Sequence, residues 1–197
     1  MGAYFRRAKM REKLLKLKID GYVQSKEFYE DKNFVILVPY YLDKSRHNLE
    51  TAELLLKLSD DRESKKALRL REDYNAYDWV ISASYYAMFH AATAALGSLG
   101  LRARNHDCLI ESMEYHFVHK KKVLETELID KIARLKSLEE KYINQMWHTK
   151  SRRNTAHYKA EASISRSDAQ RSLKDARGFV ERITNLIEEL REQGGGN

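Results

Sequence analysis

The most distinctive pattern in the chain is a long run without formal charge. From Trp79 to Leu96 there is no Asp, Glu, Lys or Arg, although these residues make up 33% of the chain. A run of this length predicts either a membrane span or a central helix that neighbouring helices cover on several sides. Polar side chains occur on every face of such a helix: Ser82, Ser84, Tyr85, Tyr86, His90 and Thr93. Burying them in lipid is costly, so the pattern favours a soluble core helix.

One stripe of this predicted helix carries very little side-chain bulk. Ala83, Ala87 and Ala91 follow one another at four-residue spacing, which places them on the same face. A second helix can therefore approach closely along this stripe. Gly97 and Gly100 supply the conformations that end a helix.

Helical spacing of apolar residues predicts four more helices, and together the five indicate an all-α, up-and-down antiparallel bundle. Their approximate ranges are 39–59, 105–117, 128–146 and 165–190. Pro39 suits the first turn of one helix, Asn105 suits an N-cap, and Ser165 with Asp168 resembles a capping box. A basic helix is expected over residues 1–18, followed by a turn at Asp20 and Gly21. The apolar run over residues 34–38 is compatible with an extended segment.

Composition is consistent with one helical domain in a chain of 197 residues with one proline and eight glycines. We expect a basic arm or extension over residues 1–38, the bundle over 39–193 and a flexible tail over 194–197. The single Cys108 rules out a disulfide framework and forms no zinc cluster. This cysteine usage and the absence of an apolar leader at the N-terminus point to the cytoplasm.

Positive charge is concentrated at the N-terminus. Seven Lys or Arg residues and one Glu lie between Met1 and Lys18, in a chain whose net charge is +7. This stretch is interpreted either as a solvated amphipathic helix with Leu14, Leu15 and Leu17 packed down, or as a contact surface for an anionic partner such as nucleic acid.

The segment from Lys141 to Ala160 is the second basic region and contains no acidic residue. Arginine binds phosphate through a fixed fork of donors, and histidine transfers protons near neutral pH. The candidate catalytic residues are Arg152, Arg153 and His157, and the candidate RNA-binding residues are His148, Lys150, Tyr158 and Lys159. The alternative is a solvated basic helix end without chemistry.

Helical geometry favours one of the two arginines as the partner of His157. On a helix, Arg153 and His157 are offset by about 40°, whereas Arg152 and His157 differ by about 140°.

No metal or cofactor is expected, because His116 and His119 have ligand-like spacing but no evident third ligand. His90 is expected to be a hydrogen-bonded core residue.

Several stretches resemble the HEPN (higher eukaryotes and prokaryotes nucleotide-binding) family, from about Pro39 to Leu190. They are SASYYAMFHAATAAL in the uncharged run, RHNLETAELLL before it, NHD after it, and the closing AQRSLKDARGFVERI. The first of them resembles the subgroup that carries SYYAMFHA.

This resemblance implies an α-helical bundle that often forms homodimers. It also implies a metal-independent endoribonuclease, commonly a toxin paired with a minimal nucleotidyltransferase antitoxin. The family motif is an Arg, four to six residues and a His, at a cleft between two protomers. Arg152 with His157 matches that gap, whereas Arg153 is followed by the polar Asn154 that the motif favours. The alternative is a catalytically inactive HEPN module that binds nucleic acid, nucleotide or the nucleotidyltransferase.

Overall fold

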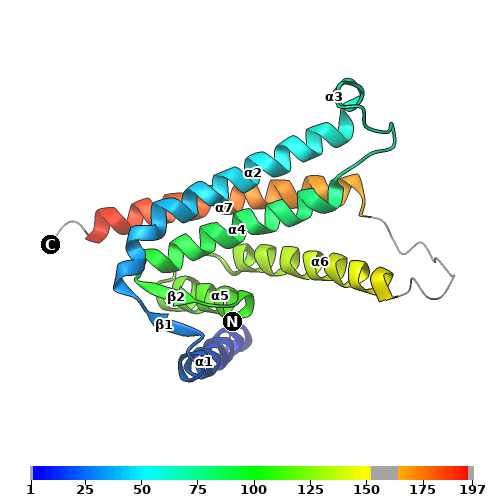
Figure 1. Ribbon diagram of the computed structural model, residues 1–197. Helices are drawn as coiled ribbons and strands as arrows, with labels where there is room; N and C mark the ends of the chain where they lie inside the picture. Colours follow the sequence, from blue (N-terminus) through cyan, green and yellow to red (C-terminus); the bar gives the residue numbers. More distant parts are fainter. Residues whose placement is uncertain (1, 152–163, 195–197) are drawn as a thin grey trace.

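Helix α4 (Tyr77–Ser98) lies in the middle of the molecule, and most other elements pack against it (Figure 1). The computed structural model describes residues 2–151 and 164–194 of the chain. The other helices in this part are α1 (Gly2–Gln24), α2 (Val38–Asp60), α3 (Arg62–Ala67), α5 (His106–Met113), α6 (Thr126–Ser151) and α7 (Arg166–Gly194). The fold is therefore all-α, as the sequence predicted, and α2, α4, α5, α6 and α7 correspond to the five expected helices.

Shorter elements connect these helices. A 3₁₀ segment, η1 (Lys32–Leu37), leads into α2, and a π-helical segment, η2 (Glu114–Lys120), continues α5. Strands β1 (Phe28–Glu30) and β2 (Leu101–Ala103) form a small antiparallel sheet in which Tyr29 lies opposite Arg102. Among the described residues, no helix is both long enough and apolar enough to cross a membrane.

The alanine stripe on α4 allows α2 to approach closely. Ala87 and Ala91 are fully buried, and Ala83 is 8% exposed. Ser45 on α2 reaches the backbone of α4 and donates a hydrogen bond from its Oγ to the carbonyl of Ala87 at 2.8 Å. Small side chains at this crossing bring the two backbones close enough for that bond, which confirms the predicted role of the stripe.

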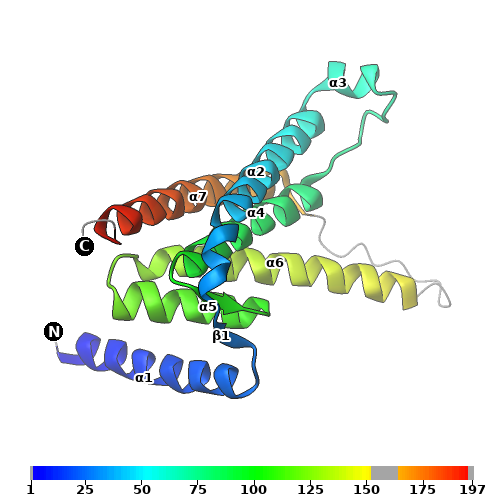
Figure 2. The same ribbon diagram turned by 60° about the vertical axis from the view of Figure 1, so that its left-hand side comes forward.

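Helix α1 lies beside α5 and η2 at the lower side of the bundle (Figure 2). Leu15 and Ile19 belong to the main core, whereas Leu14 and Leu17 are largely exposed. The expectation that all three leucines pack down is therefore wrong for two of them. The expected turn at Asp20 and Gly21 is also wrong, since α1 continues to Gln24. Packing of Ile19 and the half-buried Tyr22 stabilises the helix through the glycine, so tertiary contacts override its low helix propensity.

The sequence suggested an extended segment over residues 34–38, and this expectation is wrong. The segment forms η1 and the first residue of α2, and Phe34 is buried against Gly97 on α4. A β-carbon at Gly97 would lie only 3.1 Å from the Phe34 ring, so this glycine makes room for η1. The end of the predicted tail, residues 195–197, lies outside the described residues, and α7 continues to Gly194.

Candidate functional site

The site predicted from the sequence falls on the connection between α6 and α7. Helix α6 ends at Ser151 and α7 begins at Arg166. Five of the predicted residues lie outside the described part of the chain: Arg152, Arg153, His157, Tyr158 and Lys159. His148 and Lys150 belong to the end of α6, and their side chains also lie outside the described part. The pairing of either arginine with His157 therefore stays a prediction.

The chain that follows this connection is held firmly against α2 and α4. The amide of Asp168 donates to Ser165 Oγ at 3.2 Å, and the amide of Ser165 donates to the Asp168 carboxylate at 3.3 Å, which confirms the predicted capping box. Arg166 then donates from two nitrogens to Asp60 at the end of α2, at 2.7 and 2.9 Å. Tyr77 at the start of α4 donates to the same carboxylate at 3.1 Å. The beginning of α7 is thus fixed at one end of the bundle.

Helix α6 carries a buried carboxyl group close to the end of the part whose side chains the structure describes. Glu139 is 5% exposed, and its burial together with the charge of Glu140 raises its pKa to about 7. Its charge acts on the phenols of Tyr85 and Tyr86 on α4. Glu139 follows the buried Leu135 by four positions, so helical spacing accounts for the burial of this position but not for a carboxyl group there.

A tyrosine and a histidine are joined beside this carboxyl group. Tyr85 OH lies 2.5 Å from His106 Nδ1, across the interface of α4 and α5. Burial raises the pKa of Tyr85, and burial followed by the charge of Lys136 lowers the pKa of His106. Both groups are therefore neutral at physiological pH, and a hydrogen bond joins them. The bond holds the His106 ring against α4.

The neighbours of His106 explain the rest of the NHD stretch. Asn105 caps α5, since its side-chain oxygen accepts from the Cys108 amide at 2.8 Å. Asp107 accepts from Lys136 on α6 at 2.8 Å, and Lys136 also lies 2.9 Å from Glu140. Asn105 thus caps the start of α5, and Asp107 connects α5 to α6, so the described contacts of both residues are structural.

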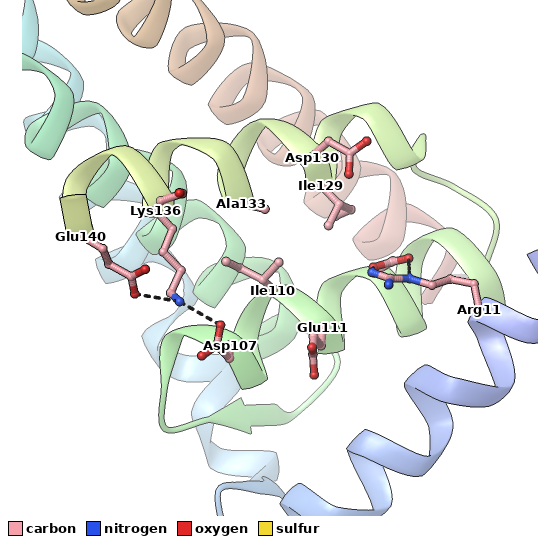
Figure 3. A pocket seen from close by; sticks show the side chains of 11 residues that line it. Arg11, Asp107, Ile110, Glu111, Ile129, Asp130, Ala133, Lys136 and Glu140 are labelled. Carbon is pink, nitrogen blue, oxygen red and sulfur yellow. Dashed lines mark hydrogen bonds and ion pairs between the residues drawn. The ribbon is translucent and has the colours of Figure 1, made fainter. Parts of the chain in front are cut away.

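A hollow lined by the first half of α6 is acidic (Figure 3). It has a volume of roughly 230 Å³ between α1, α5 and α6. Its charged lining consists of Arg11, Lys136, Asp107, Glu111, Glu114, Asp130 and Glu140. Five carboxylates against two cations disfavour an anionic ligand, so phosphate is not expected to bind here.

The half-buried His90 and His116 are poor candidates for proton transfer. Burial lowers the pKa of His90 and of His116 to about 4, so both are neutral and weakly basic at physiological pH. His90 was expected to be hydrogen-bonded, but its buried Nδ1 has no partner among the described residues. The same part of the chain contains no group of three His, Cys, Asp or Glu side chains placed to hold a metal ion.

Comparison with known proteins gives one result at the level of family. Residues 38–187 match the family model described as HEPN domain. This range begins at the first residue of α2 and ends within α7. No curated protein matches the chain. Because the matched range covers well over half of the sequence, the chain belongs to the HEPN domain family.

Proposed function

We propose that this HEPN protein is a metal-independent endoribonuclease whose site lies in the basic connection between α6 and α7. The family includes both nucleotide-binding and RNA-cleaving members, so membership alone leaves the activity open. The observation that carries the proposal is the contrast between two regions of charge. The stretch from Lys141 to Ala160 has no acidic residue, whereas the described hollow beside α6 is lined mainly by carboxylates.

The proposed reaction uses a nucleophile that belongs to the RNA. The 2′-oxygen attacks the adjacent phosphorus, the bond from phosphorus to the 5′-oxygen breaks, and the leaving oxygen takes up a proton. His157 accepts the proton from the 2′-hydroxyl or donates one to the leaving oxygen. Arg152 or Arg153 stabilises the negative charge that builds up on the phosphorane. The products are a 2′,3′-cyclic phosphate and a free 5′-hydroxyl.

Two further features belong to the same proposal. We expect a homodimer, because the family motif lies at a cleft between two protomers. Each protomer would then contribute four residues that contact the same RNA: His148, Lys150, Tyr158 and Lys159. A toxin role with a minimal nucleotidyltransferase as antitoxin, and membership of the SYYAMFHA subgroup, follow from the resemblance. Light scattering at tens of micromolar protein tests the dimer directly, and a monomer would contradict it.

The deciding experiment compares RNA cleavage by the unmodified protein, His157→Ala and His47→Ala, all in EDTA. His47 is a matched control because it is exposed on α2 and bonded within its own helix. We expect His157→Ala to lose activity by about a hundredfold to ten-thousandfold with unchanged helicity, and His47→Ala to keep it. The unmodified protein should release a 2′,3′-cyclic phosphate, and a 2′-deoxy substitution at the cut site should abolish turnover.

Two results would contradict this mechanism. Cleavage of the 2′-deoxy substrate would show that the nucleophile is not the 2′-hydroxyl, and full activity of His157→Ala would remove the histidine from the site. RNA binding without any cleavage would instead support the catalytically inactive HEPN module.

A further inference from the structure

A row of aromatic rings crosses from the small sheet to α4, outside both the α6–α7 connection and the acidic hollow. We call these residues the aromatic row: Tyr29, Phe34, Tyr40, Tyr41, Tyr86 and His90. Tyr41 lies at the centre of the row, with ring centroids 5.5 Å from Phe34, 5.4 Å from Tyr40 and 5.9 Å from His90. His90 continues the row to Tyr86 at 6.2 Å. Elements η1, α2 and α4 thus place their rings side by side. Tyr29 in β1 joins the row through Arg102, whose guanidinium carbon is 5.9 Å from the Tyr29 ring centre.

Basic side chains lie over three of these rings. The guanidinium carbon of Arg102 is 4.9 Å from the centre of the Phe34 ring, and that of Arg104 is 5.2 Å from Tyr29. At the other side of Tyr41, Lys44 Nζ is 5.0 Å from the ring of Tyr40. Each cation is attracted electrostatically to the face of its ring, and its charge can still attract an anionic ligand.

The row is not part of the closed core. Tyr40 is 51% exposed and Tyr86 is 37% exposed, although both are large aromatic residues. The Arg102 side chain is 43% exposed. Phe34, in contrast, is 3% exposed and supports the row from below. Partly exposed rings supported by buried ones can stack on a further flat group.

One acidic group next to the row is paired with a permanent cation, because Asp31 lies 3.6 Å from Arg102. Asp43 lies 3.3 Å from His47, which offsets its charge only when the imidazole is protonated. The pKa of Lys44 is raised chiefly by its side-chain hydrogen bond with Tyr40. The side of the row around Tyr40 therefore presents an exposed cation beside an exposed ring.

From these contacts we infer that the aromatic row binds unpaired RNA, with Tyr40 and Tyr86 stacking on bases and Lys44 and Arg102 contacting phosphates. The inference rests on the proposed function, for which it names the substrate class as single-stranded. Open aromatic faces combined with cations are the arrangement by which proteins bind single strands without strong sequence preference. A duplex keeps its bases stacked on one another, so these rings would have no free base face to contact.

The test measures binding of fluorescent 20-nucleotide oligouridine and of a 20-base-pair RNA duplex, using full-length protein carrying His157→Ala so that the RNA stays intact. We expect tighter binding to the single strand. Tyr40→Ala and Tyr86→Ala should each weaken that binding by about tenfold, since a stacked base contributes on the order of 1–3 kcal/mol. Tyr40→Phe keeps the ring and should bind like the parent.

Leu54→Ala is the matched control, because Leu54 is 65% exposed on the same helix as Tyr40 and lies outside the row. Far-UV circular dichroism and light scattering accompany each variant. Unchanged oligouridine binding in both alanine variants, or equal loss in Leu54→Ala, would overturn the inference. Conversion of a dimer into monomers by Tyr40→Ala or Tyr86→Ala would also overturn it, by assigning the row to the interface between two copies.

The two proposals fail in different ways. If the parent binds no RNA of either form, the proposed function itself is contradicted. If the parent binds oligouridine and the unmodified protein cleaves it, while the alanine variants in the row bind normally, only the role of the row is lost.

Discussion

Arg11 on α1 donates two hydrogen bonds to Glu114 in η2, from Nε at 2.8 Å and from Nη2 at 2.7 Å. The Glu114 side chain is 4% exposed, whereas that of Arg11 is 52% exposed. Burial favours the neutral carboxyl group, but the hydrogen bonds and charge of Arg11, with His119 nearby, outweigh burial and lower the pKa of Glu114. The pair therefore joins the N-terminal helix to the bundle through a buried carboxylate.

We predict that Arg11→Gln lowers the free energy of unfolding by about 2 kcal/mol, because it leaves the Glu114 charge buried without its main partner. Urea denaturation at neutral pH measures the effect. Arg62→Gln is the control, since Arg62 pairs with Glu72 where both side chains are more than 80% exposed, and it should cost less than about 0.5 kcal/mol. Equal effects of the two substitutions would mean that Glu114 is not buried as the structure has it.

The same pair gives a defined pH dependence. A carboxyl group with a lowered folded-state pKa contributes stability that is present above its unfolded-state pKa and is lost as the pH falls through the folded value. The difference between Arg11→Gln and the unmodified protein should therefore shrink as the pH falls below the ordinary value of 4.5 for Glu114. A difference that stays constant from neutral to acid pH would argue against an ionised Glu114.

Glu139 should have the opposite dependence. Its folded-state pKa is raised from 4.5 to about 7, so the folded protein holds the proton more tightly than the unfolded chain, and stability falls as the pH rises between these values. The shift corresponds to about 3 kcal/mol as an upper bound. We predict that Glu139→Gln is more stable than the unmodified protein at pH 8 and similar to it at pH 4, by thermal or urea unfolding.

The control for this measurement is Glu188→Gln, which replaces an exposed carboxylate on α7. It should leave the pH dependence of unfolding as it is in the unmodified protein. A Glu139→Gln variant that is less stable at pH 8 would show that the carboxylate has a favourable partner.

The helices of the bundle could be predicted because burial follows their sequence period closely. Ala87 and Ala91 on α4 and Ile132 and Leu135 on α6 are buried where helical spacing places them. Local propensity failed where a few tertiary contacts decide the conformation. Phe34 was compatible with a strand by composition, but the space beside Gly97 fixes it in η1.

The site was harder to predict than the fold, because its residues do not follow one period. Glu139 lies on the apolar stripe of α6, but spacing alone gives no reason to expect a carboxyl group there. Tyr40 and His90 meet only through Tyr41, and the sequence separates α2 from α4 by a charged segment. The aromatic row therefore requires the packing of α2 on α4 to become visible.

We predict that the positive charge of α1 adds RNA affinity without adding specificity. Removing residues 1–18 would also remove the core residue Leu15, which is 1% exposed, so deletion cannot separate binding from folding. We instead replace Lys9, Lys13 and Lys16, which are exposed on α1, with glutamine. If all three contact phosphates of a single strand, the slope of log affinity against log salt should decrease in magnitude by about 2.

Two exposed lysines on other helices provide the control for this charge effect. Lys57 lies on α2 and Lys66 on α3, and replacing both with glutamine should leave the salt slope nearly unchanged. An unchanged slope in the α1 variant would mean that this face of the helix is solvated and takes no part in RNA binding.

The choice between Arg152 and Arg153 can be resolved by chemistry. If the functional arginine stabilises the phosphorane through two parallel hydrogen bonds, lysine cannot replace it, because an ammonium group lacks the planar fork. We predict that one of Arg152→Lys and Arg153→Lys loses cleavage nearly as fully as its alanine counterpart, whereas the other retains most activity. Single-turnover rates at saturating protein separate this loss from weaker RNA binding. Full activity of both lysine variants would show that the site needs positive charge there but no guanidinium. Loss in Arg153→Lys alone would favour helical geometry, in which Arg153 and His157 share a face, and loss in Arg152→Lys alone would favour the four-residue spacing of the family motif.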